Sequence, residues 1–145
     1  MPERLDPYQA SPAAMAAMLA LEVALARCAL EPSLVLLARL RTSQMNACAW
    51  SVDLEYGEAR RAGELPRRLD QLSVWRDSLL FTARERAALA WAEFLLQPAP
   101  HDAPAALDAA SVAFTDTELA ELTVVLCAVH GWNRFGRGLR RVLVA

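Results

Sequence analysis

Three side chains capable of chemistry, Cys48, Ser51 and Glu55, follow one another at positions i, i+3 and i+7. Residues with this spacing share one face of an α-helix, so a helix through the segment would point all three the same way. A cysteine thiolate is a nucleophile, and a nearby carboxyl group accepts or donates a proton. The pattern would place a catalytic site on one helix; the alternative for Cys48 is a buried cysteine without a chemical role. The alternative for Glu55 is a structural ion pair with a nearby arginine.

The start of this helix decides how reactive the thiol would be. Asn46 is a good N-cap residue, which would place Cys48 at the second helical position. The unpaired amides and the helix dipole there favour a thiolate by roughly 0.3–1 kcal/mol. An ionised Glu55 about two turns away opposes the thiolate by a similar amount. Because the two effects nearly cancel, the sequence gives no reason to expect an activated thiol.

His130 is the remaining candidate, because it lies in the last expected helix, shortly before Trp132. If that helix packs against the Cys48 helix, the imidazole would approach the thiol; the alternative is a structural histidine. His101 lies in a proline-rich loop and is predicted to be solvated. Two distant histidines and three scattered cysteines lack the spacing of metal ligands, so we predict no metal and no other cofactor.

The cysteines and the apolar segments also bear on location. Cys28 and Cys127 fall on apolar helical faces and are predicted to lie in the core. An odd number of widely spaced cysteines does not form a disulfide framework, which favours a reducing compartment. The start of the chain lacks a signal-peptide pattern, and the apolar segment Ala13–Leu21 is too short to span a bilayer. We therefore expect a cytoplasmic protein with no membrane partner.

Helix signals are strong and strand signals are almost absent, which predicts an all-α fold. Ser11-Pro12 reads as an N-cap followed by proline at the first helical position, and Thr82–Glu85 and Thr115–Glu118 are capping boxes. Gly63 suits a helix end. We expect six or seven helices in a single domain over residues 1–145, at about 12–30, 34–43, 46–63, 67–72, 82–97, 105–114 and from 115 onward, the last loosened by Gly131, Gly136 and Gly138.

Composition restricts the partners. The net charge is −2, and acidic and basic residues are interleaved, which excludes the basic face of a nucleic-acid-binding protein. The absence of lysine excludes a Schiff-base mechanism. Apolar residues make up 55% of the chain, which suggests either an apolar surface buried in a homo-oligomer or an alanine-rich helical composition.

Several motifs in order resemble the alkylhydroperoxidase D / carboxymuconolactone decarboxylase family. The resemblance covers about residues 36–134 and implies the all-α alkylhydroperoxidase D-like fold and a homo-oligomer, trimeric or hexameric. The matching segments are Ser43-Gln44-x-Asn46-x-Cys48-x-x-x-x-Asp53, Ala59-Arg60-x-x-Gly63, Leu72-x-x-Trp75-Arg76, Phe81-Thr82-x-Arg84-Glu85-Arg86-Ala87-Ala88-Leu89 and Trp132-Asn133-Arg134.

The redox motif of that family is incomplete here. The family carries Cys-x-x-Cys-x-x-x-His on one helix, with a glutamate about twelve residues before the first cysteine. Cys48 matches the first cysteine, whereas Ser51 replaces the second, Glu55 the histidine and Leu36 the glutamate. A serine cannot close a disulfide, so the family's dithiol cycle cannot run within this motif.

The resemblance therefore leaves three functions open. The first is at most one-Cys hydroperoxide reduction or redox sensing through Cys48. The second is an acid–base reaction of the carboxymuconolactone decarboxylase kind, in which Ser51, Glu55 and His130 act on a small carboxylate. The third is a non-catalytic ligand-binding oligomer.

Overall fold

A computed structural model describes residues 5–97 and 103–139, so His101 lies outside the described residues. These residues form eight α-helices and contain no strand, which confirms the all-α prediction. Six of the helices have at least 11 residues, close to the expected number. The helices are α1 (Pro7–Ala10), α2 (Pro12–Leu25), α3 (Pro32–Met45), α4 (Ala49–Arg61), α5 (Pro66–Asp70), α6 (Ala83–Leu96), α7 (Ala103–Ala113) and α8 (Asp116–Gly138), with a 3₁₀ turn at Leu72–Val74.

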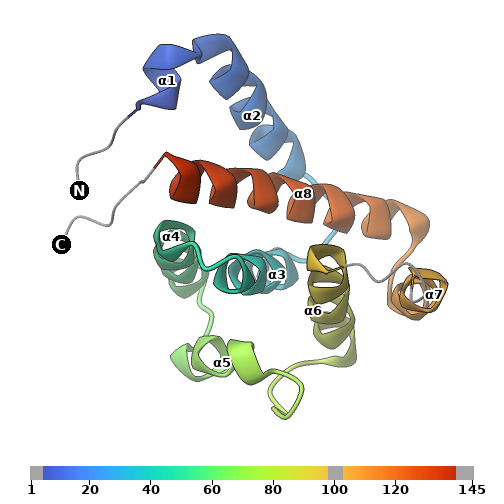
Figure 1. Cartoon of the computed structure of the whole chain (residues 1–145). Helices are drawn as coiled ribbons and strands as arrows, with labels where there is room; N and C mark the ends of the chain where they lie inside the picture. The colour runs from blue at the N-terminus through green and yellow to red at the C-terminus, as the bar shows by residue number, and fades with distance from the viewer. Residues whose placement is uncertain (1–4, 98–102, 140–145) are drawn as a thin grey trace.

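Helix α3 lies at the centre of the fold and packs against α4, α6 and α8 (Figure 1). Its Leu37, Ala38 and Leu40 are almost completely inaccessible to solvent. One core cluster lies between α3, α6, α7 and α8, and a second lies between α3, α4, the 3₁₀ turn and α6. This packing holds α3 and α4 side by side beneath α8, where the candidate residues are located (Figure 1).

Most helix starts follow the sequence signals. Both capping boxes form. The side chains of Thr82 and Thr115 accept from the backbone N–H groups of Glu85 and Glu118, and each glutamate carboxylate accepts from the backbone N–H of its threonine. Gly63 ends α4 with φ 94°, a left-handed conformation that glycine adopts without strain. Ser11 is the N-cap of α2, but its side chain makes no capping hydrogen bond.

Three expected boundaries were wrong. The first long helix ends at Leu25 rather than near Leu30, because a turn precedes the proline-started α3. Asn46 is the C-cap of α3 and not the N-cap of the following helix, so α3 continues to Met45. The glycines of α8 do not loosen it before Gly138, because α8 is packed along its length against α2, α3 and α4.

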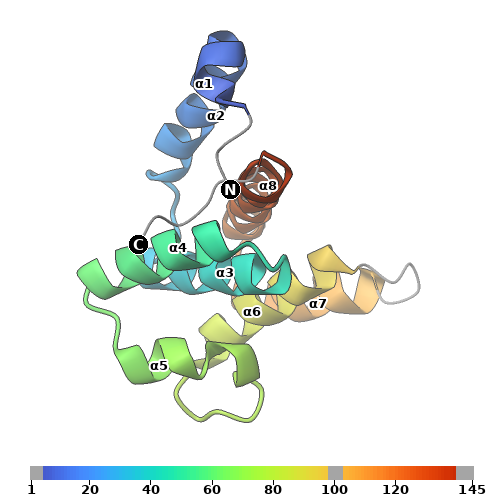
Figure 2. The same ribbon diagram turned by 60° about the vertical axis from the view of Figure 1, so that its left-hand side comes forward.

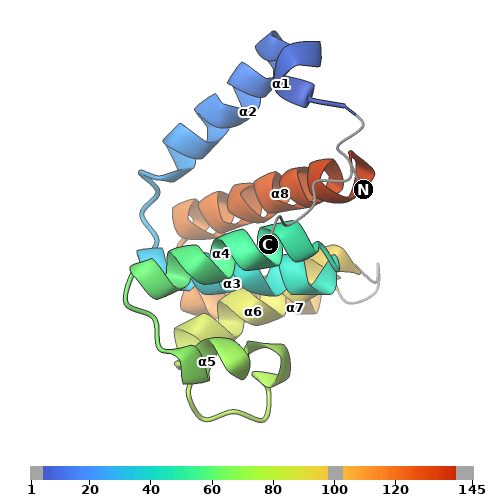
Figure 3. The same cartoon turned by 90° about the vertical axis from the view of Figure 1, so that its left-hand side faces the viewer.

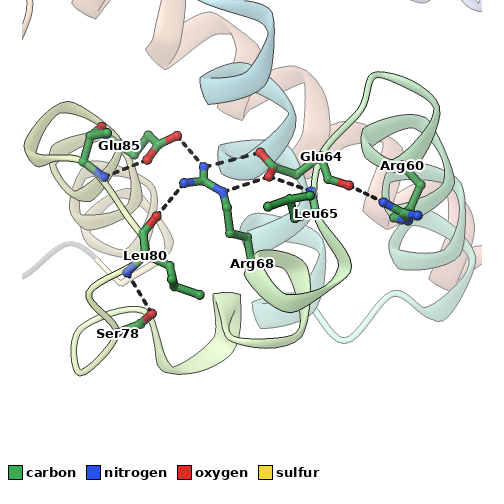
Figure 4. A network of polar contacts seen from close by, with 8 residues as sticks. Arg60, Glu64, Leu65, Arg68, Ser78, Leu80 and Glu85 are labelled. Atoms are coloured by element: carbon green, nitrogen blue, oxygen red, sulfur yellow. Dashed lines mark hydrogen bonds and ion pairs between the residues drawn. The ribbon is translucent and has the colours of Figure 1, made fainter.

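Arginine–glutamate pairs fasten the peripheral segments to the core. Arg68 of α5 binds Glu64 (2.8 Å) and Glu85 (2.6 Å), and donates to the carbonyl of Leu80, so that one guanidinium joins α5, the following loop and α6 (Figure 4). Glu93 of α6 similarly accepts from Trp75 and pairs with Arg76 at 2.6 Å.

Helices α1 and α2 lie on the far side of α8 from α3 and α4 (Figures 2 and 3). In α2 only Met15 is fully buried, whereas Leu19 is 45% and Val23 62% exposed. The arm made by α1 and α2 is joined to the rest of the molecule largely through α8 and, as described below, through Glu22.

Two cysteines that were predicted to lie in the core are less buried than expected. Cys127 is exposed on α8, so its predicted core position was wrong, because the apolar pattern of α8 extends around more of the helix than the core covers. Cys28 is half-buried in the turn after α2, beside the first core cluster. Among the residues described, no helix combines the length and apolarity needed to cross a membrane.

Candidate active site

A tight turn between α3 and α4 brings the predicted residues together. Ala47 adopts φ 51°, and the backbone N–H of Cys48 donates to the carbonyl of Ser43 at 3.1 Å. This turn makes Cys48 the N-cap of α4, two residues after Asn46, the expected cap. Ser51 and Glu55 then follow on the inner face of α4, and all three side chains are at most 3% exposed.

The sulfur of Cys48 lies in the contact between α4 and α8. Its Sγ donates to Ser51 Oγ at 3.3 Å. A Cβ placed on Gly136 of α8 would lie 2.7 Å from Sγ, closer than a Cβ approaches other heavy atoms in folded proteins. The thiol is therefore packed against α8 and does not itself line the neighbouring cavity, whereas its hydrogen-bond partner Ser51 does.

Glu55 faces a cavity of about 220 Å³ between the α1–α2 arm and helices α3, α4 and α8. Oε1 of Glu55 lies 3.6 Å from Nε of Arg39, while Oε2 is buried with no hydrogen-bond partner. The lining residues are Tyr8, Leu19, Glu22, Arg39, Trp50, Ser51, Leu54, Glu55, Glu58 and Trp132. Of the four residues predicted to act chemically, Ser51 and Glu55 line this cavity.

One arginine pairs with glutamates from two different helices that line the cavity. Arg39 of α3 pairs with Glu22 of α2 at 3.0 Å as well as with Glu55. The indole N–H of Trp132 donates to the same Glu22 at 2.8 Å. Arg39 is thus held between two carboxylates, and Glu22 fixes the arm over the cavity.

Burial raises the pKa of Glu55 to about 7. Ser43 and the positive charge of Arg39 act in the opposite direction, while the negative charges of Glu58 and Glu22 add to the rise. A carboxyl group with this pKa is present in both protonation states near neutral pH, which is the condition for efficient proton transfer in either direction. Such shifted groups in cavities are concentrated at functional sites.

His130 lies elsewhere. Asn46 Nδ2 donates to its Nδ1 at 2.8 Å, and Nε2 is buried without a partner. Burial, together with the charge of Arg134, lowers the pKa of His130, which favours the neutral imidazole. His130 lines a separate pocket with Cys127, so it does not share the cavity of Glu55.

A polar chain links the two regions behind the turn. Asn46 also donates to Asn133 Oδ1 at 2.7 Å, and Asn133 Nδ2 donates to Ser43 Oγ at 2.9 Å. Asn133 and Ser43 are almost completely buried. These bonds hold α8 against the α3–α4 turn, which gives Asn46 a structural role in place of the predicted N-cap.

Sequence reasoning missed Arg39, Glu22 and Glu58. Arg39 carried a signal, since it is a charged residue within the apolar run Leu34–Leu40 and lies one helical turn after Leu36. Glu22 gave no signal, because its approach depends on how α2 folds over α8. Within residues 5–97 and 103–139, no group of three or more potential ligands is placed to hold a metal ion.

The helical fold and the segment around Cys48 at the start of α4 point to a known family. The model of the carboxymuconolactone decarboxylase family matches residues 9–94, more than half of the chain, and the chain belongs to this family.

The chain is also similar to two individual proteins. The chain is 25% identical over 135 residues, 92% of each chain, to the uncharacterized protein YdfG of Bacillus subtilis (strain 168). It is also similar to the crystal structure of ATU0492 from Agrobacterium tumefaciens, with a TM-score of 0.92 and 34% identity over 99% of each chain. ATU0492 is described as a protein of unknown function and a candidate antioxidant defence protein AhpD.

Proposed function

We propose that the cavity at Glu55 is the active site of a small-molecule enzyme, in which the Glu55 carboxyl group transfers protons to and from a bound substrate. The observation that carries this proposal is an unpartnered carboxylate oxygen of a 3%-exposed glutamate that faces a cavity. Buried polar atoms are normally hydrogen-bonded, so an orphaned one in a cavity indicates a position completed by a ligand.

The geometry suits proton transfer at a carbon next to a carbonyl group. Ionised Glu55 would take the proton from that carbon, and the electron pair of the broken C–H bond would move into the enolate. Arg39 lines the same cavity and supplies positive charge for the enolate oxygen. Protonated Glu55 would then return the proton to the same carbon or to a different carbon of the enolate, and the carbonyl group would form again.

Hydrogen exchange tests this proposal before the substrate is identified. The protein would be incubated in D₂O at pH 7 with small carbonyl compounds of neutral, anionic and cationic charge, and loss of the α-proton signal would be followed by ¹H NMR. We expect catalysed exchange for at least one class, and its loss in Glu55→Gln. Cys48→Ala and Asp53→Asn, an exposed carboxylate on the same helix, should retain it. Equal exchange in Glu55→Gln would contradict the proposal.

One contact favours a second candidate, one-Cys hydroperoxide reduction through Cys48. The Cys48 sulfur is 3.3 Å from Ser51 Oγ, and Ser51 lines the cavity. The thiolate would attack one peroxide oxygen, forming an S–O bond as the O–O bond breaks and an alcohol leaves; an external thiol would then reduce the sulfenic acid. The candidate antioxidant role described for ATU0492 is consistent with this reaction.

Oxidation of the cysteines by a hydroperoxide distinguishes the two candidate functions. An organic hydroperoxide should produce sulfenic acid at Cys48 faster than at exposed Cys127, which serves as the internal control. Trapping with a dimedone reagent and mass spectrometry would measure both sites. Modification of Cys127 alone would exclude peroxide reduction through Cys48 and leave the acid–base proposal unaffected.

A further inference from the structure

The cavity at Glu55 carries more negative than positive charge. Three carboxylates line it, those of Glu22, Glu55 and Glu58, against the single guanidinium of Arg39. Arg39 is shared between Glu22 and Glu55. Glu58, one helical turn after Glu55 on α4, makes no ion pair with any residue in the described part of the chain.

The most deeply buried of these carboxylates has one oxygen without a hydrogen-bond partner. Glu55 is 3% exposed, and its Oε2 accepts no hydrogen bond from any described residue. A buried charge is costly unless it is paired and hydrogen-bonded. A ligand with N–H donors and a positive charge would supply both for Glu55 and would also compensate Glu58.

The walls and size of the cavity restrict the rest of the ligand. The rings of Tyr8, Trp50 and Trp132, together with Leu19 and Leu54, provide apolar and aromatic surface around the carboxylates. Aromatic faces attract organic cations. The cavity volume of about 220 Å³ is small for a ligand pocket, which favours a compact molecule.

We propose that this cavity binds a small organic cation, an amine carrying one compact aromatic or aliphatic group, with its ammonium between Glu55 and Glu58. The proposal deepens the proposed function and rests on it only in placing substrate and ligand in the same cavity. A carboxylate ligand is disfavoured, because Arg39 is already paired with two glutamates and three carboxylates would repel the ligand.

A matched set of ligands tests the charge. Benzylamine, benzyl alcohol and benzoate share one ring and differ in charge, and their binding at pH 8 would be measured by calorimetry and by the indole N–H resonance of Trp132. We expect benzylamine to bind at least about tenfold more tightly than benzyl alcohol, the size of one charge-assisted hydrogen bond. Benzoate should bind most weakly of the three.

Variants locate the site. Glu55→Gln and Glu58→Gln should each weaken benzylamine binding by about tenfold, because each removes one charged acceptor. Asp53→Asn removes the same charge from an exposed position on the same helix and should leave the affinity unchanged. Glu58 is only half-buried, so its variant tests the site even if Glu55→Gln folds poorly.

The outcomes separate this inference from the proposed function. Benzoate binding as tightly as benzylamine, no binding by any of the three, or equal weakening by Asp53→Asn would overturn the cation proposal. Hydrogen exchange lost in Glu55→Gln would still support proton transfer in that case. Conversely, selective benzylamine binding without catalysed exchange would leave the cation site standing and remove the enzymatic role.

Discussion

Glu55 lies where burial and charge act against each other. Its carboxyl group is 3% exposed, its counterion Arg39 is 3.6 Å away, and that counterion is shared with Glu22. Burial therefore dominates and raises the pKa of Glu55 to about 7. The charged groups that face Glu55 are Arg39 from α3, Glu22 from α2 and Glu58 from α4, and the α8 side chain beside it, Trp132, is uncharged.

This pKa makes folding stability depend on pH in a known direction. The unfolded chain loses the Glu55 proton near the ordinary glutamate pKa of 4.5, whereas the folded chain retains it to about pH 7. The free energy of unfolding should therefore fall as pH rises from 4.5 to 7, by an amount on the order of 3 kcal/mol, because each pKa unit is worth about 1.4 kcal/mol. Urea unfolding of wild type and Glu55→Gln at pH 5 and pH 8 measures it.

In that experiment Glu55→Gln should lose less stability than the wild type between the two pH values, since its amide does not titrate. Asp53→Asn should behave as the wild type, because Asp53 is exposed. Identical pH dependence in wild type and Glu55→Gln would show that Glu55 titrates normally in the folded chain.

The close packing of Gly136 on Cys48 gives a second prediction at this scale. In Gly136→Ala the added methyl group would lie 2.7 Å from Sγ, so we expect a loss of about 1–3 kcal/mol in the free energy of unfolding. Gly138→Ala, on the same helix with open space around it, should be neutral or slightly stabilising.

A double variant identifies the cause. Cys48→Ala removes the sulfur, so combining it with Gly136→Ala should cost less than the sum of the two single changes. Strict additivity would show that the contact between Sγ and residue 136 does not limit the packing of α8 on α4.

At the scale of the helices, two helix starts that both look well capped in the sequence differ in their capping hydrogen bonds. Thr115 completes a capping box on α8, whereas the Ser11 side chain makes no capping bond on α2. Thr115→Ala should reduce the free energy of unfolding by about 1 kcal/mol. Ser11→Ala should change it by less than about 0.5 kcal/mol. Chemical denaturation compares the two, and an equal cost for both variants would contradict the difference in capping.

Sequence signals predicted a helix start correctly where its capping hydrogen bonds form between residues close together in the sequence. The Thr-x-x-Glu boxes and the prolines at helix starts determine their own hydrogen bonds within a few residues, so α6 and α8 began where expected. Asn46 was misassigned because its side chain bonds to Asn133 and His130 on α8, contacts that are distant in sequence. The Cys48 turn therefore depends on packing that a local pattern does not contain.

The residues of the candidate site likewise fall into those that the sequence could predict and those that it could not. Cys48, Ser51 and Glu55 were predicted because they occupy the positions of the family's redox motif, whose spacing places them on one face of α4. The partners that determine the charge state of Glu55 come from other helices, Arg39 from α3 and Glu22 from α2. The sequence could therefore identify Glu55 as a candidate for proton transfer, but not the arginine and glutamates that affect its pKa.

At the scale of the whole molecule, α2 is the element with the least cover. Thirteen of its fourteen residues are uncharged, and Leu19 and Val23 are largely exposed. A helix that is apolar on most sides is normally buried. We therefore propose that a second copy of the chain covers α2, in agreement with the homo-oligomer that the family resemblance implies.

Light scattering at micromolar concentration should give a mass of several chains, three or six on the family expectation. Val23→Asp, 62% exposed in one chain, should reduce the mass to that of a smaller species because a charge would be buried in the contact. Val112→Asp, 90% exposed on α7, is the matched control and should not change it. A monomeric wild-type protein would contradict the proposal.

The account depends most directly on the ionisation of Glu55. The ¹³C resonance of its side-chain carboxyl carbon, assigned by its disappearance in Glu55→Gln, can be followed by NMR between pH 3 and pH 9. We predict a midpoint close to pH 7, as burial beside a shared arginine requires. A midpoint near the ordinary glutamate value of 4.5 would contradict the proton-transfer role of this cavity.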